Sequence, residues 1–259
     1  MADPRAPTFD ATIGALEAIV DRCSAEGDRI GYFAAMYVAV STAMRERTAS
    51  GQFSDPARTE RFVAGFAGRY IDALTGWRDG TGCSASWQAA FGAAPKWRPI
   101  ILQHLLLGMN AHINLDLGVA AATIGAGAPL EAMRADFDAV NDVLGQLIDG
   151  CQGALDEVSP WCRLADKVGG RSDETLIRFS LVAARDQAWS VASRLSALTG
   201  DAQDREIASV DRATAGVADV VEHPGFAASA LLLAVRARER AEPAEVMRIL
   251  RAVRPTAPA

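Results

Sequence analysis

One long apolar segment, residues 99–124, constrains the fold of this chain more than any other feature. Within it, HLLLGMNAHINLDLG (residues 104–118) combines leucines with two histidines, two asparagines and one aspartate. A helix that is apolar on most of its surface is buried by its neighbours. Its polar side chains are then buried too, which is costly for every group that finds no partner. The segment therefore predicts a helical domain with a metal or substrate site at its centre.

The rest of the sequence also favours helices. Alanine, leucine, arginine and glutamate are frequent, and β-branched residues rarely alternate with polar ones. Between loops with glycine or proline, we predict helices over residues 12–25, 30–48, 56–77, 84–93, 99–124, 129–155 and 173–198, and two or three more up to 253. We therefore predict an all-α, single-domain, multi-helix bundle over residues 11–253, with flexible ends at 1–10 and 254–259.

Composition argues against several classes of function. The formal net charge of -6 disfavours general nucleic-acid binding, which needs a basic surface. The four cysteines (23, 83, 151 and 162) form no CxxC pair, so neither a zinc ribbon nor a redox motif is indicated. Neither a secretory signal nor about 18 uninterrupted apolar residues are found. We expect a cytoplasmic protein with no nucleic-acid or membrane partner.

The polar residues of the central segment form stripes on a helical wheel. His112 and Asp116 are four residues apart and share one face. Gly108 lies on the same stripe and adds no bulk, and His104 lies about 80° around the helix from His112. We predict His112, Asp116 and His104 as catalytic residues, together with Asn110 on the opposite side. Without a metal, His112 oriented by Asp116 is a reasonable general base.

A divalent metal is the other chemistry that this spacing suits. An imidazole and a carboxylate four residues apart on a helix can bind one cation. Asp138 and Asp142 share a face of the next helix, which a short connection would make an antiparallel neighbour. We predict His112, Asp116, Asp138 and Asp142 as ligands of Zn, Fe, Mn or Mg, with His104 as a further ligand or hydrogen-bond donor.

Four further residues are candidates for substrate binding. Asn114 pairs with Asn110 at a spacing of four residues. Tyr37, Arg69 and Tyr70 lie on the second and third predicted helices, where an arginine beside a tyrosine could bind an anionic group. An interhelical ion pair or a packed tyrosine is the structural alternative for these positions.

The central block LLLGMNAHINLDL (residues 105–117) resembles the signature segment of an uncharacterised, mostly bacterial family that is classed only as a domain of unknown function. FAGRYIDAL (66–74) and SWQAAF (86–91) fit the same resemblance, which covers most of the chain. It implies no established chemistry.

A weaker resemblance concerns NDVLGQLID (residues 141–149), which is similar to the second metal-binding motif of class I terpene synthases. The resemblance implies that Asn141, Gly145 and Asp149 hold magnesium for a diphosphate substrate. The closing acid is Asp rather than Glu, and no aspartate-rich DDxxD segment lies upstream.

These patterns predict a small-molecule enzyme with a His/Asp site in the core of a helical bundle. We expect it to be metal-assisted and to act on a small, largely apolar molecule by hydrolysis, elimination or cyclisation, or oxidation. A non-enzymatic module for ligand binding or dimerisation is the first alternative, in which the polar cluster fixes helix register. A terpene-synthase-like cyclase acting on diphosphates is the second. A homodimer is compatible with each.

Overall fold

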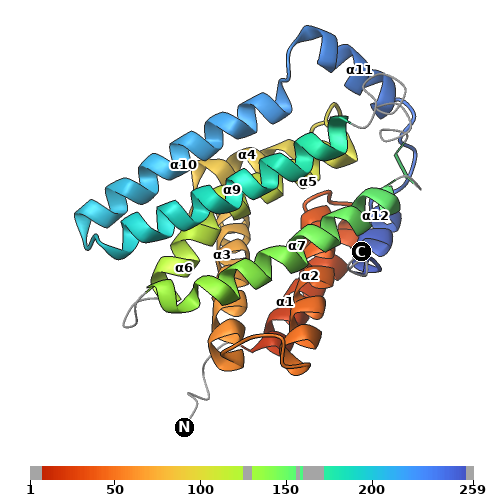
Figure 1. Cartoon of the computed structure of the whole chain (residues 1–259). Helices are drawn as coiled ribbons and strands as arrows, with labels where there is room; N and C mark the ends of the chain where they lie inside the picture. The colour runs from red at the N-terminus through yellow and green to blue at the C-terminus, as the bar shows by residue number, and fades with distance from the viewer. Residues whose placement is uncertain (1–7, 125–129, 156–157, 160–171, 255–259) are drawn as a thin grey trace.

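The computed structural model describes residues 8–124, 130–155, 158–159 and 172–254, and every regular element within them is a helix (Figure 1). The predicted all-α bundle is thereby confirmed. The helices are α1 (Phe9–Glu26), α2 (Gly31–Ala49), α3 (Pro56–Arg78), α4 (Ala85–Ala93), α5 (Ile101–Ala111), a π-helix (His112–Asp116), α6 (Leu117–Ile124), a 3-10 helix (Leu130–Met133), α7 (Arg134–Leu155), α9 (Ser172–Ser196), α10 (Asp201–Glu222), α11 (Phe226–Arg236) and α12 (Pro243–Arg251).

Local capping explains several helix starts. The Thr8 side chain accepts a hydrogen bond from Ala11 N, so α1 begins within the predicted flexible end, and Phe9 packs into the core. Asp55 caps α3 through Arg58 N. The predicted breaks near residues 223 and 243 are also found. Residues 255–259 of the predicted flexible C-terminus lie outside the described part of the chain.

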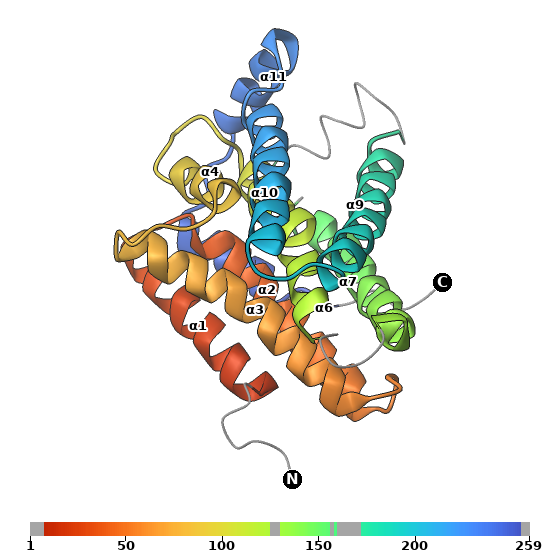
Figure 2. The same cartoon turned by 90° about the vertical axis from the view of Figure 1, so that its left-hand side faces the viewer.

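The apolar segment is the centre of the bundle. α5, the π-helix and α6 form one continuous helix from Ile101 to Ile124. It packs against α2 and α3 on one side and against α9 and α10 on the other. Figures 1 and 2 show α1, α2 and α3 grouped together, with α9 and α10 across the central helix from them.

The central helix is also apolar enough to resemble a membrane span. Its most apolar window has a mean hydropathy of 1.2, and 83% of that window is buried inside the protein. A single helix of this kind is equally typical of the core of a water-soluble bundle.

Glycines allow the central helix to approach its neighbours closely. A Cβ atom at Gly108 would lie 2.7 Å from the Phe33 ring of α2. A Cβ atom at Gly118 would lie 2.8 Å from Val191 Cγ1 of α9. Both distances are shorter than side chains tolerate, so these two positions fix how near α2 and α9 can lie. His112 and Asp116, which lie between these two glycines, are consequently buried among densely packed neighbours.

Candidate functional site

The middle of the central helix contains a wide turn at the residues that the sequence singled out. The backbone N–H of Leu117 donates to the carbonyl of His112, five residues earlier, which is a π-type hydrogen bond. Such turns replace the regular α-helical bond and occur frequently at functional sites. Here the turn spans His112–Asp116 and therefore sets the direction of both predicted catalytic side chains.

Asp116 is held by donors from two other helices. One carboxylate oxygen accepts from Arg69 Nε of α3 at 2.7 Å, and the other accepts from Trp87 Nε1 of α4 at 2.8 Å. Asp116 is only 1% exposed, whereas the Arg69 side chain is 34% exposed. The carboxylate is therefore a buried junction between three helices whose charge is balanced by Arg69. Sequence reasoning missed Trp87 as a partner.

His112 lies beside this junction, inside an aromatic shell. Its Nδ1 is 3.5 Å from an Asp116 carboxylate oxygen. Its ring stacks on Phe66 at a centroid distance of 3.6 Å, and the Tyr37 ring approaches at 4.6 Å. Burial lowers the pKa of His112, and Asp116 opposes that shift. Neither ring nitrogen of His112 forms a hydrogen bond with the described residues.

The predicted substrate-binding residues of α2 and α3 belong to the same packed region. The hydroxyl groups of Tyr37 and Tyr70 are buried without a hydrogen-bond partner among the described residues, and burial raises the pKa of both. Both rings contact Phe33. Arg69 is occupied by Asp116. The structure therefore brings Tyr37, Arg69 and Tyr70 together with His112, as neighbours within the core.

Asn110 and Asn114 serve a different contact. Asn110 Nδ2 donates to the carbonyl of Thr214 in α10 at 2.9 Å, and Asn114 Nδ2 donates to Asn110 Oδ1 at 2.8 Å. This chain of hydrogen bonds satisfies the buried amide of Asn110 and attaches the central helix to α10. The predicted catalytic and substrate-binding roles of these two residues find no support in it.

The predicted metal ligands on the next helix are not close to His112 and Asp116. α7 packs mainly against α2, α9 and α12, so its polar face does not lie opposite that of the central helix as we expected. Asp138 is exposed and pairs with Arg134 at 2.9 Å, and Asp142 is exposed too. In the described part of the chain, no group of three or more His, Cys, Asp or Glu side chains is arranged to hold a metal ion.

The terpene-synthase-like motif falls in the same helix. Gly145 lies near Arg185 of α9, because a Cβ atom there would be 3.7 Å from its guanidinium. The side chains of Asn141 and Asp149 lie outside the described residues. The placement of α7 gives no support for the predicted metal cluster.

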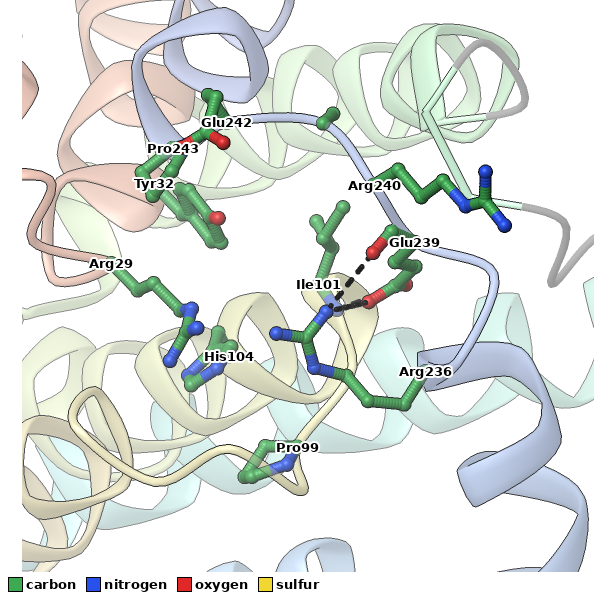
Figure 3. A pocket seen from close by; sticks show the side chains of 11 residues that line it. Arg29, Tyr32, Pro99, Ile101, His104, Arg236, Glu239, Arg240, Glu242 and Pro243 are labelled. Carbon is green, nitrogen blue, oxygen red and sulfur yellow. Dashed lines mark hydrogen bonds and ion pairs between the residues drawn. The ribbon is translucent and has the colours of Figure 1, made fainter.

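His104, the third predicted residue of the polar stripe, opens into a pocket of about 200 Å³. The charged and polar wall of this pocket comes from Arg29 and Tyr32 near the start of α2 and from Arg236 and Glu239 near the end of α11 (Figure 3). The guanidinium groups of Arg29 and Arg236 point toward the space beside the imidazole. This is the accessible end of the polar stripe.

His104 is buried, and the Tyr32 ring meets it edge-on at 5.9 Å. Its Nε2 has no hydrogen-bond partner among the described residues. Burial lowers the pKa of His104 to about 3, and the charges of Arg29 and Arg236 add to this effect. The imidazole is therefore neutral at pH 7 and has hydrogen-bonding capacity that the protein does not use.

Glu239 closes the pocket at the start of α5. Its two carboxylate oxygens each lie 3.2 Å from Ile101 N, and one accepts from Ser159 Oγ at 2.7 Å. Burial raises the pKa of Glu239 despite these donors. The sequence analysis missed Arg29, Tyr32, Arg236 and Glu239, because they come from two segments about 200 residues apart and no local motif links them.

These features define an all-α bundle with a buried Asp116–Arg69–Trp87 junction and an arginine-lined pocket on the same central helix. The chain belongs to the family described as "Family of unknown function (DUF5995)", whose profile matches residues 9–224. The resemblance to an uncharacterised family is thereby confirmed. No curated protein and no solved structure matches the chain. The family match ends before α11, so Arg236 and Glu239 lie beyond it.

Proposed function

We propose that this protein is a small-molecule enzyme in which His104 accepts a proton from, or a hydrogen bond of, a substrate held in the arginine-lined pocket. The observation that carries the proposal is the His104 side chain, which lines a pocket of about 200 Å³ and whose buried Nε2 is unpartnered within the described residues. Pockets with a few convergent polar groups and perturbed pKa values are the preferred places for substrate binding and chemistry.

The lining of the pocket favours a polar substrate rather than the largely apolar one that the sequence predicted. Tyr32, Arg29, Arg236 and Glu239 surround His104. A neutral imidazole beside these groups can accept a hydrogen bond of a substrate, but it is a weak base while the charges of Arg29 and Arg236 are not offset. The geometry favours this end of the polar stripe over its middle, because His112 is enclosed by aromatic side chains.

The predicted metal chemistry fits the described residues less well. A metal at His112 and Asp116 would compete with Arg69 and Trp87, which already engage both carboxylate oxygens. Asp138 and Asp142 lie on a helix that packs elsewhere. We therefore assign the His112–Asp116 cluster a positioning role: it fixes the central helix against α3 and α4, and with it the location of His104.

The proposal can be tested by incubating the purified protein with a mixture of cellular metabolites and following their amounts by mass spectrometry. We expect the wild type to consume at least one metabolite and His104→Gln to leave it unchanged. His223→Gln is a matched control, because His223 is exposed and bonded only to Asp219 among the described residues. Conversion that His104→Gln preserves would overturn the role of His104. Retention of a metabolite without conversion would favour the non-enzymatic binding module.

A further inference from the structure

We propose that the pocket beside His104 recognises a small organic molecule through a single carboxylate group, which Arg29 and Arg236 bind. This inference rests on the proposed function, since it names the substrate class of the same site. It is drawn from the charges and hydrogen bonds of the pocket wall, and binding can be measured without knowledge of the reaction.

Arg29 supplies positive charge that no acid of the described residues neutralises through an ion pair. Its Nη1 donates to the carbonyls of Ala94 and Lys96 at 3.0 and 3.1 Å. Backbone carbonyls fix the position of the guanidinium but leave its full charge in place. A guanidinium held in this way is pre-organised for a planar carboxylate.

Arg236 faces the pocket from the end of α11. Its Nε donates to the carbonyl of Trp97 at 2.7 Å, and its guanidinium lies 5.5 Å from the centre of the Trp97 ring. It is 3.8 Å from a carboxylate oxygen of Glu239. That carboxylate also accepts from Ile101 N at 3.2 Å, so it neutralises Arg236 only in part.

The charge of the lining fits one carboxylate better than a phosphate. Three arginines (Arg29, Arg236 and Arg240) and two glutamates (Glu239 and Glu242) line the pocket, which leaves one net positive charge with His104 neutral. A monoanion completes this balance, whereas a phosphate dianion would exceed it. The volume of about 200 Å³ is slightly larger than a cavity of roughly 150 Å³ that holds benzene, so the ligand is of the size of benzoate or a short-chain acid.

Carboxylate binding would also change the chemistry of His104. The charges of Arg29 and Arg236 help to lower the pKa of His104 in the free protein. A bound carboxylate offsets those charges and makes the imidazole more basic. Substrate binding would thus prepare the base that acts on it.

Binding can be tested by titrating the full chain at pH 7 with benzoate, propionate, their neutral amides and inorganic phosphate, observed by NMR. We expect at least one of the two carboxylates to bind and its amide to bind at least about tenfold more weakly. Arg236→Gln should weaken carboxylate binding by about ten- to a hundredfold, since a charge-assisted hydrogen bond is lost. Arg22→Gln is the matched control, because Arg22 is exposed and pairs with Glu26.

A backbone NMR spectrum shows whether Arg236→Gln keeps the fold, and Arg29→Gln tests the second guanidinium independently. Equal binding of acid and amide, or unchanged affinity in both folded variants, would overturn the inference. Binding of phosphate alone would overturn the carboxylate assignment. Absence of carboxylate binding together with His104-dependent conversion of a metabolite would reject the substrate class and keep the enzyme. Carboxylate binding without conversion of any metabolite would keep the ligand class and reject the enzymatic function.

Discussion

His104 and His112 belong to the same polar stripe of one helix, about 12 Å apart along its axis, yet they occupy opposite kinds of environment. Both are buried, and burial lowers the pKa of both. His112 has an anionic neighbour and is covered by aromatic rings. His104 has cationic neighbours and borders a pocket. Burial of a histidine is therefore not enough to mark a site; access and uncompensated charge around it separate the two.

The largest expected effect on the free energy of unfolding concerns the buried Asp116–Arg69–Trp87 junction. Asp116→Ala leaves the guanidinium of Arg69 and the indole N–H of Trp87 without their acceptor. Hydrogen bonds to a charged group contribute about 1.5–3 kcal/mol each, and we expect the free energy of unfolding, measured with urea, to decrease by at least about this amount, since two such bonds are lost. Asp138→Asn, on the exposed face of α7, should change it by less than about 0.5 kcal/mol. Similar values for both variants would contradict the distinction between junction and surface.

A smaller effect on stability is expected at Gly108, which lies between the two histidines on the central helix. Gly108→Ala places a methyl group 2.7 Å from the Phe33 ring, and Phe33 contacts His112. We expect destabilisation by about 1–3 kcal/mol from overpacking. Gly14→Ala in α1 is the control, because its Cβ atom meets nothing within 4 Å; it should stabilise the protein by about 0.5–1 kcal/mol. Thermal unfolding of both variants would show whether α2 and α5 tolerate any separation.

The pH dependence of the free energy of unfolding tests the environment of His104 beside the pocket. The pKa of His104 is about 3 in the folded protein against 6.5 normally. Between these values the unfolded chain binds a proton that the folded protein does not, so stability falls as the pH decreases below 6.5. This contribution reaches about 1.4 kcal/mol per pH unit. His104→Gln should therefore lose less stability than the wild type between pH 7 and pH 4 in urea titrations. An identical pH profile would show that the pKa of His104 is the same in the folded and the unfolded protein.

The smallest effect is expected at the contact with α10. Asn114→Ala removes one hydrogen bond from the half-buried amide chain but leaves that of Asn110 to Thr214. We expect a loss of about 0.5–1.5 kcal/mol and unchanged carboxylate binding at His104. A marked loss of ligand binding in this variant would show that the asparagine pair belongs to the site after all.

The structural features that helical periodicity and capping determine could be predicted from the sequence. The boundaries of α2, α3 and α4, the burial of the central helix and the shared face of His112 and Asp116 follow from local rules. Local rules do not predict which helices pack against those faces, because spacing along one helix does not identify the neighbouring helix. Hence α7 was placed opposite the central helix, and Trp87 was not recognised as a donor to Asp116. The arginines of the pocket depend on how α11 folds back toward α2, which no local pattern encodes.

The wide turn at His112–Asp116 also has a consequence for how this helix could tolerate insertions and deletions. A π-type bond accommodates one more residue than an α-helical turn. Deletion of one residue in the turn would remove the extra residue and restore a regular helix whose two ends keep their angular relation, whereas deletion from a regular α-helical turn would rotate one end by about 100° relative to the other. A deletion elsewhere between His104 and Gly118 would therefore move either His104 out of its pocket or Gly118 away from α9, whereas a deletion in the wide turn would keep both contacts. The wide turn is thus the place where the central helix can lose a residue without changing the relative direction of its two ends.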